Sequence, residues 1–315
     1  MHVERRVFIL ITMWKGRFDG DDPLYQRLFQ RVQESSDFSS IAQGDFVLHG
    51  FAVDEGVRRN RGRVGAKDAP NIIRKNMANF PIVNPNFVLH DLGNIDCQDE
   101  NLEVAQSKLT SSVSSVLVKG GKSVVLGGGH EVTFAHFSAI RNAFPNKNIG
   151  IINIDAHFDN REVDQKTGAS SGTGFYQIGQ NESLNSLHIG IQRNSNTLKL
   201  FDTAHNLGMK YILADELFFE NLSSIYQKID EFAASVDLLY LTICMDVFNV
   251  SIAPGVSAPA YNGIFADATF MHWYRRILKN EKLVALDVAE VNPTYDIGER
   301  TARLAASLVN EWWMI

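Results

Sequence analysis

Eight short apolar runs recur along the chain, and each has the length and the β-branched or aromatic content of a buried strand. The longer stretches between them carry apolar residues at the spacing of an amphipathic helix. Strands that alternate with helices predict an α/β fold with a parallel sheet covered by helices on both faces. The eight predicted strands are residues 46–51, 87–92, 123–126, 149–154, 187–191, 211–213, 238–243 and 283–288.

Two of the predicted helices have clear end signals. Asp68 and Pro70 make the cap-plus-proline pattern of a helix start, and Gly120 follows residues 102–118 as a helix end. A chain of 315 residues could hold two average domains. Sheets covered by helices on both faces often reach this size as one unit, so we expect one domain spanning residues 1–315.

The composition narrows the expected partners and the compartment. Hydrophobic residues make up 45% of the chain and charged residues 21%, as in a globular protein with a sizeable core. The formal net charge of -6 is spread along the chain, so neither nucleic acid nor a membrane surface is an expected partner. The apolar residues 7–12 are too short for a secretion signal, and no run reaches the ~20 residues of a membrane span. Only Cys97 and Cys244 occur, which favours a reducing compartment and predicts a cytoplasmic location.

Two long segments, residues 160–186 and 248–265, lack regular patterning. Unstructured connections of this length inside a compact domain are usually functional loops. Each segment follows a predicted strand that ends in acidic residues, and ligands bind open α/β sheets outside the carboxyl ends of the strands. These strand ends are therefore the expected place of the functional site.

Asp155, His157 and Asp159 occupy alternate positions just after the predicted strand 149–154. Alternate side chains of an extended chain point the same way, so two carboxylates and an imidazole would converge at the edge of the sheet. Converging charges of this kind destabilise one another unless a cation lies among them. The alternative is a solvated loop in which acidic residues recur by chance. The spacing favours a metal site.

Three other predicted strands end in residues of the same kind. One runs through three glycines, which allow a tight turn, into His130. This turn has neither the Gly-Lys-Ser/Thr ending of a Walker loop nor the spacing of a dinucleotide fingerprint. Another strand leads into Cys244 and Asp246, and the last leads to Glu290. Each could be an ordinary strand end, but four such ends in one chain favour a shared site.

These motifs resemble those of the ureohydrolases, the family of arginase, agmatinase and formimidoylglutamase. The matches span most of the chain in the family's order, and their combination is highly specific. The resemblance implies a three-layer α/β/α fold with a mostly parallel eight-stranded sheet, and two manganese ions bridged by hydroxide. The matching segments are GGHE at 128–131, DAHFD at 155–159, MD at 245–246 with the APG that follows, and DVAEVNP at 287–293.

The resemblance also assigns roles to residues. It implies that Asp159 passes a proton to the leaving nitrogen and that Glu290 pairs with the cationic group of the substrate. Arginases have aspartate at the position of Cys244. A thiolate is a softer ligand than a carboxylate and favours zinc-like or iron-like ions over manganese. The alternative is that Cys244 is a buried apolar cysteine beside a weakly held metal. The implied metal ligands are His130, Asp155, His157, Asp159, Cys244 and Asp246.

Further segments resemble the formimidoylglutamase branch: DEGVRRNRGR at 54–63, SSGT at 170–173 and APGVSAP at 253–259. Arginases place a histidine where Phe175 stands, which counts against arginase activity. The branch implies hydrolysis of N-formimidoyl-L-glutamate to L-glutamate and formamide, in histidine degradation. Arginine suits the two carboxylates of this substrate, although most arginines merely lie on surfaces. The candidate substrate-binding residues are Arg58, Arg59, Arg63, Arg161, Ser171 and Thr173.

Two alternatives stay open. One is another ureohydrolase that acts on arginine, agmatine or a guanidino acid. The other is a metal-poor, inactive relative that acts as a binding protein, which the cysteine at position 244 makes worth keeping. Homo-oligomers are common in the family, but the sequence carries no signal strong enough to count subunits.

Overall fold

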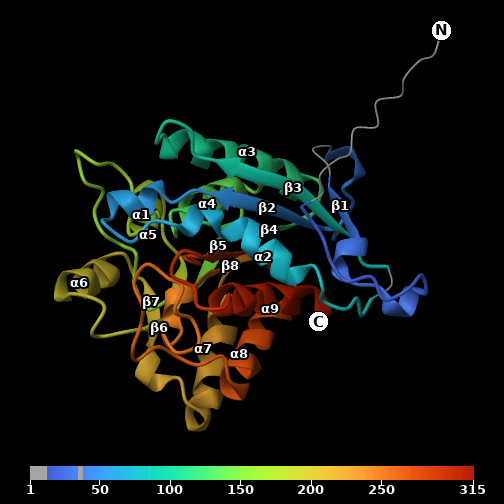
Figure 1. The fold of residues 1–315 in the computed structure, drawn as a ribbon. Helices are drawn as coiled ribbons and strands as arrows, with labels where there is room; N and C mark the ends of the chain where they lie inside the picture. The colour runs from blue at the N-terminus through green and yellow to red at the C-terminus, as the bar shows by residue number, and fades with distance from the viewer. Residues whose placement is uncertain (1–12, 35–37, 85) are drawn as a thin grey trace.

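A sheet of nine parallel strands runs through the computed structural model, which describes residues 13–34, 38–84 and 86–315 (Figure 1). The strand order is β1-β3-β2-β4-β9-β8-β5-β6-β7. The strands are β1 Val32–Glu34, β2 Phe46–Ala52, β3 Leu89–Asp96, β4 Lys122–Gly127, β5 Ile149–Ile154, β6 Ser186–Ile191, β7 Lys210–Leu213, β8 Leu238–Cys244 and β9 Leu283–Ala289. The predicted parallel α/β fold is confirmed. Residues 7–12, which we do not expect to be a secretion signal, lie outside the described residues.

The sheet has one strand more than the eight predicted. All eight predicted runs form strands, with ends shifted by a few residues, and the additional strand is β1. It pairs with β3 at the edge of the sheet, and none of its three residues is buried. The sequence Val-Gln-Glu contains a single apolar residue, so a search for apolar runs does not detect it.

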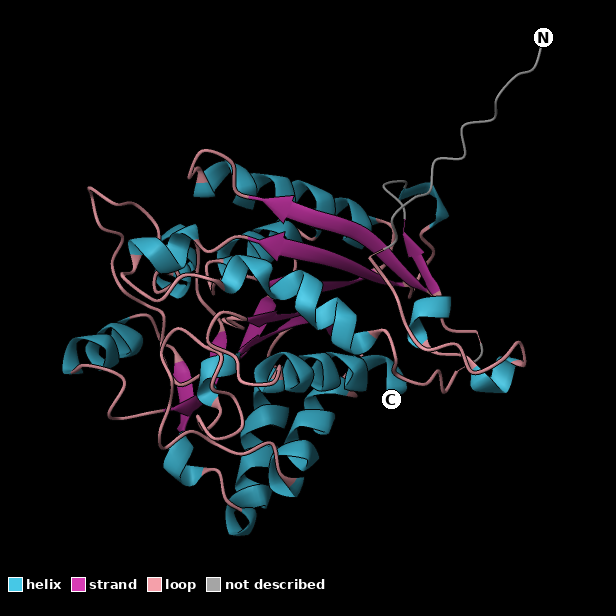
Figure 2. Ribbon diagram, viewed as in Figure 1, coloured by secondary structure: helices cyan, strands magenta, loops and turns pink. Residues whose placement is uncertain are grey.

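Helices cover both faces of the sheet and complete the three predicted layers (Figure 2). They are α1 Glu55–Arg59, α2 Ala69–Met77, α3 Leu102–Val118, α4 Val132–Ala143, α5 Gly174–Asn181, α6 Leu198–Asn206, α7 Leu222–Ala234, α8 Ala268–Leu278 and α9 Arg300–Met314. α2, α7, α8 and α9 contribute to the core on one face, and α3, α4, α5 and α6 to the core on the other. As predicted, α2 begins directly after Asp68 and Gly120 follows α3 in a left-handed conformation. No helix in the described residues is long and apolar enough to cross a membrane.

The two cores meet opposite faces of the same strands. In β4, Val124 and Leu126 belong to one core and Val125 to the other. In β5, Ile152 belongs to the first of these cores and Ile151 to the second. Consecutive side chains of a strand point to opposite faces. A strand buried on both faces therefore reads as a continuous apolar run, which is why the central strands were predictable.

β4, β9, β8 and β5 are neighbours in the middle of the sheet. Because the strands are parallel, the segments after their carboxyl ends come together at one edge. Of the two segments expected to be irregular, 160–186 contains α5, whose two glycines hide its helical pattern. The described segment 248–265 has no helix or strand beyond isolated bridges. Both segments lie beside the strand ends that carry acidic residues.

Candidate metal centre

Side chains from the ends of β4, β5 and β8 meet at the carboxyl edge of the sheet. Asp155 follows β5 directly, and Cys244 is the last residue of β8. Asp246 lies in the 3-10 turn Met245–Val247 that follows β8. His130 lies in the turn between β4 and α4. The topology thus brings together residues that are more than a hundred positions apart in the sequence.

The turn after β4 depends on glycine. A Cβ atom at Gly128 would lie 1.7 Å from the carbonyl oxygen of Val53, so no larger residue fits there. The carbonyl of Gly128 accepts a hydrogen bond from the Glu290 amide at 2.8 Å. In return, the backbone N–H of His130 donates to Glu290 Oε1 at 2.9 Å. The turn therefore fixes His130 and Glu290 relative to each other.

His130, Asp155 and Cys244 form the first of two ligand clusters. Their potential ligand atoms all lie within 4.8 Å of one another. His130 Nδ1 lies 3.1 Å from Asp155 Oδ2 and 2.8 Å from Asp159 Oδ2. Asp159 therefore lies beside this cluster, as predicted, but the chain bends at residues 156–157 and is left-handed at Asp159 instead of staying extended.

Asp155, His157 and Asp246 form the second cluster, again with ligand atoms within 4.8 Å. His157 Nδ1 lies 3.2 Å from Asp246 Oδ2 and 3.6 Å from Asp155 Oδ1. The His157 backbone N–H also donates to Asp155 Oδ1 at 2.8 Å. Asp155 is common to the two clusters and offers one carboxylate oxygen to each.

The donor set suits a pair of divalent cations. Asp246 Oδ1 is buried and has no hydrogen-bond partner among the described residues, although buried polar atoms are nearly always bonded. A buried carboxylate oxygen without a partner is costly unless a cation compensates it. Imidazole, carboxylate and thiol groups are the side chains that bind such cations in proteins.

Burial and neighbouring charges shift the pKa values of the cluster. Burial alone would lower the pKa of His130 and of His157, but nearby carboxylates outweigh it and raise both pKa values well above the usual range. Burial, followed by the charge of Asp155, raises the pKa of Asp159. The same two causes raise the pKa of the Cys244 thiol well above its ordinary value. Without a cation, therefore, the imidazoles hold protons, and metal binding releases such protons.

Thr242, which the sequence analysis did not select, and Asp287, the first residue of the matching segment 287–293, hold the far side of the His130 ring. The Thr242 hydroxyl lies 2.9 Å from His130 Nε2 and donates to Asp287 Oδ1 at 2.6 Å. Both residues are fully buried. This contact leaves His130 Nδ1 facing the carboxylates. A hydroxyl two positions before Cys244, on the same face of an otherwise apolar strand, is the signal that could have identified Thr242.

Asp159 and Glu290 both adopt left-handed backbone conformations, with φ of 46° and 66°. Aspartate tolerates this conformation, but glutamate rarely adopts it, and such strain often occurs at functional sites. Both side chains border the same cavity. The strained backbone of Glu290 thus occurs at a position where the resemblance implies catalysis.

A cavity of about 330 Å³ opens onto the cluster. The side chain of His157 is 25% exposed and that of Asp159 is 16% exposed, whereas His130 and Asp155 are buried beneath them. A small molecule in the cavity would therefore reach the ligand cluster directly. The lining residues are Asn60, Arg61, Gly62, Arg63, His157, Asp159, Arg161, Ser171, Ser195, Leu200, Cys244, Asp246, Ser257, Ala258 and Glu290.

Of the four candidate arginines, only two line this cavity. Arg63 and Arg161 do so. Arg58 and Arg59 do not, because both guanidinium groups donate to the buried carboxylate of Glu55. Substrate binding by these two residues is therefore not supported by their placement.

Arg61 lines the cavity although the sequence analysis did not select it. Its backbone is left-handed, with φ of 61°. Its guanidinium makes no hydrogen bond or ion pair with any of the described residues. In a run that contains four arginines, composition alone does not indicate which side chain reaches the cavity.

The Ser171 hydroxyl borders the cavity, whereas Thr173 does not. The Thr173 hydroxyl accepts the Ser170 N–H and donates to the Ser170 carbonyl, both at 2.9 Å, so it stabilises the loop before α5. Phe175 is fully buried and packs edge-to-face with the His130 ring at a centroid distance of 6.4 Å. Thr173 is thus a structural residue of the loop in this arrangement.

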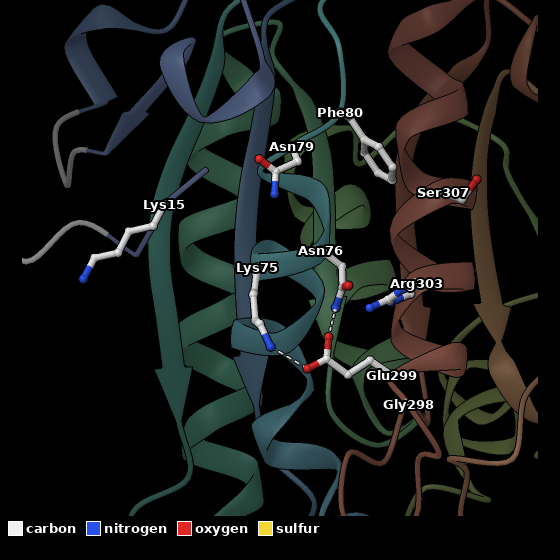
Figure 3. Close-up of a pocket in the computed structure, with 9 residues that line it drawn as sticks. All are labelled: Lys15, Lys75, Asn76, Asn79, Phe80, Gly298, Glu299, Arg303 and Ser307. Carbon is white, nitrogen blue, oxygen red and sulfur yellow. Dashed lines mark hydrogen bonds and ion pairs between the residues drawn. The ribbon is translucent and has the colours of Figure 1, made fainter. Parts of the chain in front are cut away.

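A larger hollow of about 760 Å³ lies on a different surface, between α2 and α9 (Figure 3). Lys75 and Asn76 donate to the Glu299 carboxylate at 2.5 and 3.1 Å. Its lining residues, all in the described part of the chain, include no histidine or cysteine, and their one carboxylate is already bonded. Size alone therefore does not identify the functional site.

Comparison with known proteins shows the family of this chain. Residues 44–314 match the arginase family. The formimidoylglutamases of Staphylococcus carnosus (strain TM300) and Staphylococcus aureus (strain MRSA252) are 38% and 39% identical to this chain, over 95% and 96% of it and 97% of their own lengths. A crystal structure of Trypanosoma cruzi formiminoglutamase with Mn2+2 has a TM-score of 0.78 at 26% identity, covering 91% of this chain and 97% of that one. The structure of formimidoylglutamase from Bacillus subtilis subsp. subtilis str. 168 has a TM-score of 0.84 at 19% identity, covering 95% and 94%, which shows a common fold. This chain therefore belongs to the arginase family, as its motifs predicted.

Proposed function

We propose that this chain hydrolyses N-formimidoyl-L-glutamate to L-glutamate and formamide, a step in histidine degradation. The observation that supports this most is the meeting of two ligand clusters on the shared carboxylate of Asp155, at the floor of a cavity. The two staphylococcal relatives that cover nearly the whole chain carry the name formimidoylglutamase.

We propose that the two clusters hold two divalent cations, of the kind that Mn2+ represents in the Trypanosoma cruzi structure. His130, Asp155, Asp159 and Cys244 would hold one ion. Asp155, His157 and Asp246 would hold the other. With both ions bound, water loses a proton near neutral pH and becomes a nucleophile that can attack the amidine carbon.

Asp159 is suited to carry the proton of the reaction. Its carboxylate borders the cavity and lies within hydrogen-bond distance of His130. The side chain of Asp159 is 16% exposed, so it can reach both the ion site beside His130 and a molecule in the cavity. The proton taken from water would then pass to the glutamate nitrogen as its bond to the formimidoyl carbon breaks.

Glu290 is placed to orient the formimidoyl group. One carboxylate oxygen accepts the His130 N–H, and the side chain borders the cavity. A cationic amidine that pairs with this carboxylate would be held with its carbon facing the two ion sites. Such positioning lowers the barrier because the reacting atoms are already aligned.

Arg61 and Arg161 are the arginines best placed for the two carboxylates of the substrate. Both line the cavity, and neither guanidinium is bonded to another described residue. Arg63 also lines it, but its side chain already donates to the carbonyls of Val256 and Ser257. The Ser171 hydroxyl offers a further contact. A guanidinium binds a carboxylate through two parallel hydrogen bonds, which would favour an acidic substrate over arginine or agmatine.

A substrate panel tests this proposal directly. The purified chain, loaded with Mn2+, is incubated with N-formimidoyl-L-glutamate, arginine, agmatine and guanidino acids. We expect formamide from the first and no urea from the others. Urea from any of them would assign the chain to another ureohydrolase activity. A chain that binds no metal and turns over none of the substrates would instead be a binding protein.

The Glu290→Gln variant tests the role of one side chain. The amide keeps the shape but removes the charge that pairs with the amidine, so we expect turnover to fall by about 100- to 1,000-fold. Metal content should stay unchanged because Glu290 is not an expected ligand. Formamide release and metal analysis measure the two properties, with the exposed Glu281→Gln variant as a control. Loss of metal from the Glu290 variant would contradict the assigned role.

We also propose that the chain works in the cytoplasm as one domain, residues 1–315. Both cysteines are free, and both cores pack against a single sheet. The homo-oligomer that is common in the family is a further proposal, which light scattering of the purified chain tests.

A further inference from the structure

The two candidate ion sites differ in their donor atoms. The cluster of His130, Asp155 and Cys244 offers nitrogen, oxygen and sulfur. The cluster of Asp155, His157 and Asp246 offers only nitrogen and oxygen. Since Asp155 is shared, the sulfur of Cys244 is what distinguishes the two sites.

The position of Cys244 is fixed by the sheet. It is the last residue of β8, has an extended backbone and lies opposite Ala289 in the neighbouring strand. Thr242, two positions earlier on the same face, lies against His130 Nε2. Strand alternation therefore directs the Cys244 side chain to the His130 side of the cluster, where it borders the cavity.

The surroundings of Cys244 do not suit a cysteine that merely fills space. Only 1% of the residue is exposed, and its sulfur lies within 4.8 Å of ligand atoms of His130 and Asp155. A buried cysteine that serves as a small hydrophobic residue is normally surrounded by apolar side chains. A sulfur atom beside an imidazole and a carboxylate is instead in the environment of a metal ligand.

We propose that the two ions of the centre are held unequally, because Cys244 gives the ion beside His130 a thiolate ligand. This site would select a softer divalent cation such as Zn2+ or Co2+, since thiolate prefers such ions. The site formed by Asp155, His157 and Asp246 would bind harder ions such as Mn2+. The inference depends on the proposed function only in that cations bind at this edge of the sheet.

Cobalt titration of the metal-free full-length chain tests the inference. Bound Co2+ is counted by equilibrium dialysis, and near-ultraviolet absorption reports the charge-transfer band that thiolate gives and that imidazole and carboxylate do not. We expect two ions per chain and a thiolate band that saturates with one of them. Cys97→Ser, the matched control, should keep the band. Cys244→Ser should lose it while still binding Co2+ at the other site.

The outcomes separate this inference from the proposed function. Two bound ions without a thiolate band would overturn the inference and leave the binuclear hydrolase intact. A band that disappears in Cys97→Ser and persists in Cys244→Ser would overturn it as well. A chain that binds no cobalt would remove both the inference and the proposed function.

The Cys244→Asp variant gives a second test that does not depend on the charge-transfer absorption. A carboxylate at this position should make the two sites alike in donor type. We expect the preference for Zn2+ over Mn2+ at the affected site to fall by at least about tenfold, the lower end of what changes to residues around a ligand produce. Competition dialysis with the two metals measures the ratio. An unchanged ratio would show that Cys244 does not touch the ion.

Discussion

This protein has two groups of buried charges, the ion pair of Arg74 with Asp91 and the metal cluster. They differ in what supplies the positive charge that balances their carboxylates. Between α2 and β3, Arg74 and Asp91 form a fully buried ion pair with bonds of 2.7 and 2.8 Å. Trp14 and the Gly93 amide donate to the same carboxylate, and Asn94 accepts from the guanidinium. Every oxygen of Asp91 therefore has its partners within the chain.

The metal cluster is equally buried, but it lacks a fixed cation. Its carboxylates face His130 and His157, whose raised pKa values show that they compensate the charge by holding protons. Asp246 Oδ1 still has no hydrogen-bond partner among the described residues. The protons on His130 and His157 can leave to solvent, whereas the guanidinium of Arg74 keeps its charge and cannot leave the chain. Of the two groups, only the metal cluster can therefore release its compensating positive charge when an ion binds. Burial alone thus does not mark a site, whereas buried charge with an exchangeable partner does.

The Asp155→Asn variant should have the largest effect, because it disrupts the metal cluster. Asp155 belongs to both clusters, so removing its charge weakens both ion sites at once. We expect turnover to fall by at least about 10,000-fold, as when one member of a catalytic unit is removed, and bound metal to fall below one ion per chain. Formamide release and metal analysis measure these losses. The same change at the exposed Asp202 is the control, and retention of two ions by the Asp155 variant would contradict the shared-ligand assignment.

The Arg74→Met variant should disrupt the other group, the buried ion pair of Arg74 with Asp91. Methionine keeps much of the length but leaves the Asp91 carboxylate buried without its cation. We expect the free energy of unfolding to fall by about 3–5 kcal/mol, while metal binding by the folded fraction is kept. Denaturant unfolding measures the loss. Arg275→Met removes the partly exposed pair with Glu311 and should cost at most about 1 kcal/mol. Equal losses of unfolding free energy in the two variants would mean that the buried Arg74 pair stabilises the fold no more than the partly exposed Arg275 pair.

The metal cluster was far more predictable from the sequence than the ion pair of Arg74 with Asp91. Asp155, His157 and Asp159 are close in one segment, so their proximity was predictable, although the chain bends at residues 156–157 instead of staying extended. Arg74 and Asp91 gave no such signal, because they lie in separate elements, α2 and β3, and no spacing pattern links them. Long-range pairing of this kind appears only when the packing of α2 on the sheet is known.

The arginines show the same limit within the site itself. Arg58 and Arg61 lie in one basic run, and only Arg61 reaches the cavity. The difference comes from Glu55, which binds Arg58, and from the left-handed backbone at Arg61. Strand β1 was missed for a related reason, since an edge strand without buried residues carries no apolar pattern. Local periodicity predicted the sheet and the ligand cluster, whereas side-chain partners had to be observed.

His49 provides a third kind of buried titratable group. It lies in β2, where its Nε2 atom is 2.8 Å from the Ser112 hydroxyl, and its Nδ1 atom has no partner among the described residues. Burial, followed by the charge of His136, lowers the pKa of His49 from the usual 6.5 to about 3. Asp91 raises it and Arg74 lowers it by smaller amounts. His49 is thus buried in the neutral form, without the fixed cation of Arg74 or the protons of the metal cluster.

The His49→Gln variant sharpens the comparison through the pH dependence of stability. Between its folded pKa of about 3 and its ordinary value of 6.5, His49 binds a proton in the unfolded chain but not in the folded one. Stability from this group is therefore present above pH 6.5 and is lost as the pH falls towards 3. We expect the wild type to lose up to about 1.4 kcal/mol more per pH unit across this range than the variant, in which glutamine keeps a polar contact for Ser112 but does not titrate. Unfolding by denaturant at a series of pH values measures both slopes. Parallel slopes would mean that His49 takes up its proton in the folded protein, and burial without a compensating charge would then not be what separates it from His130 and His157.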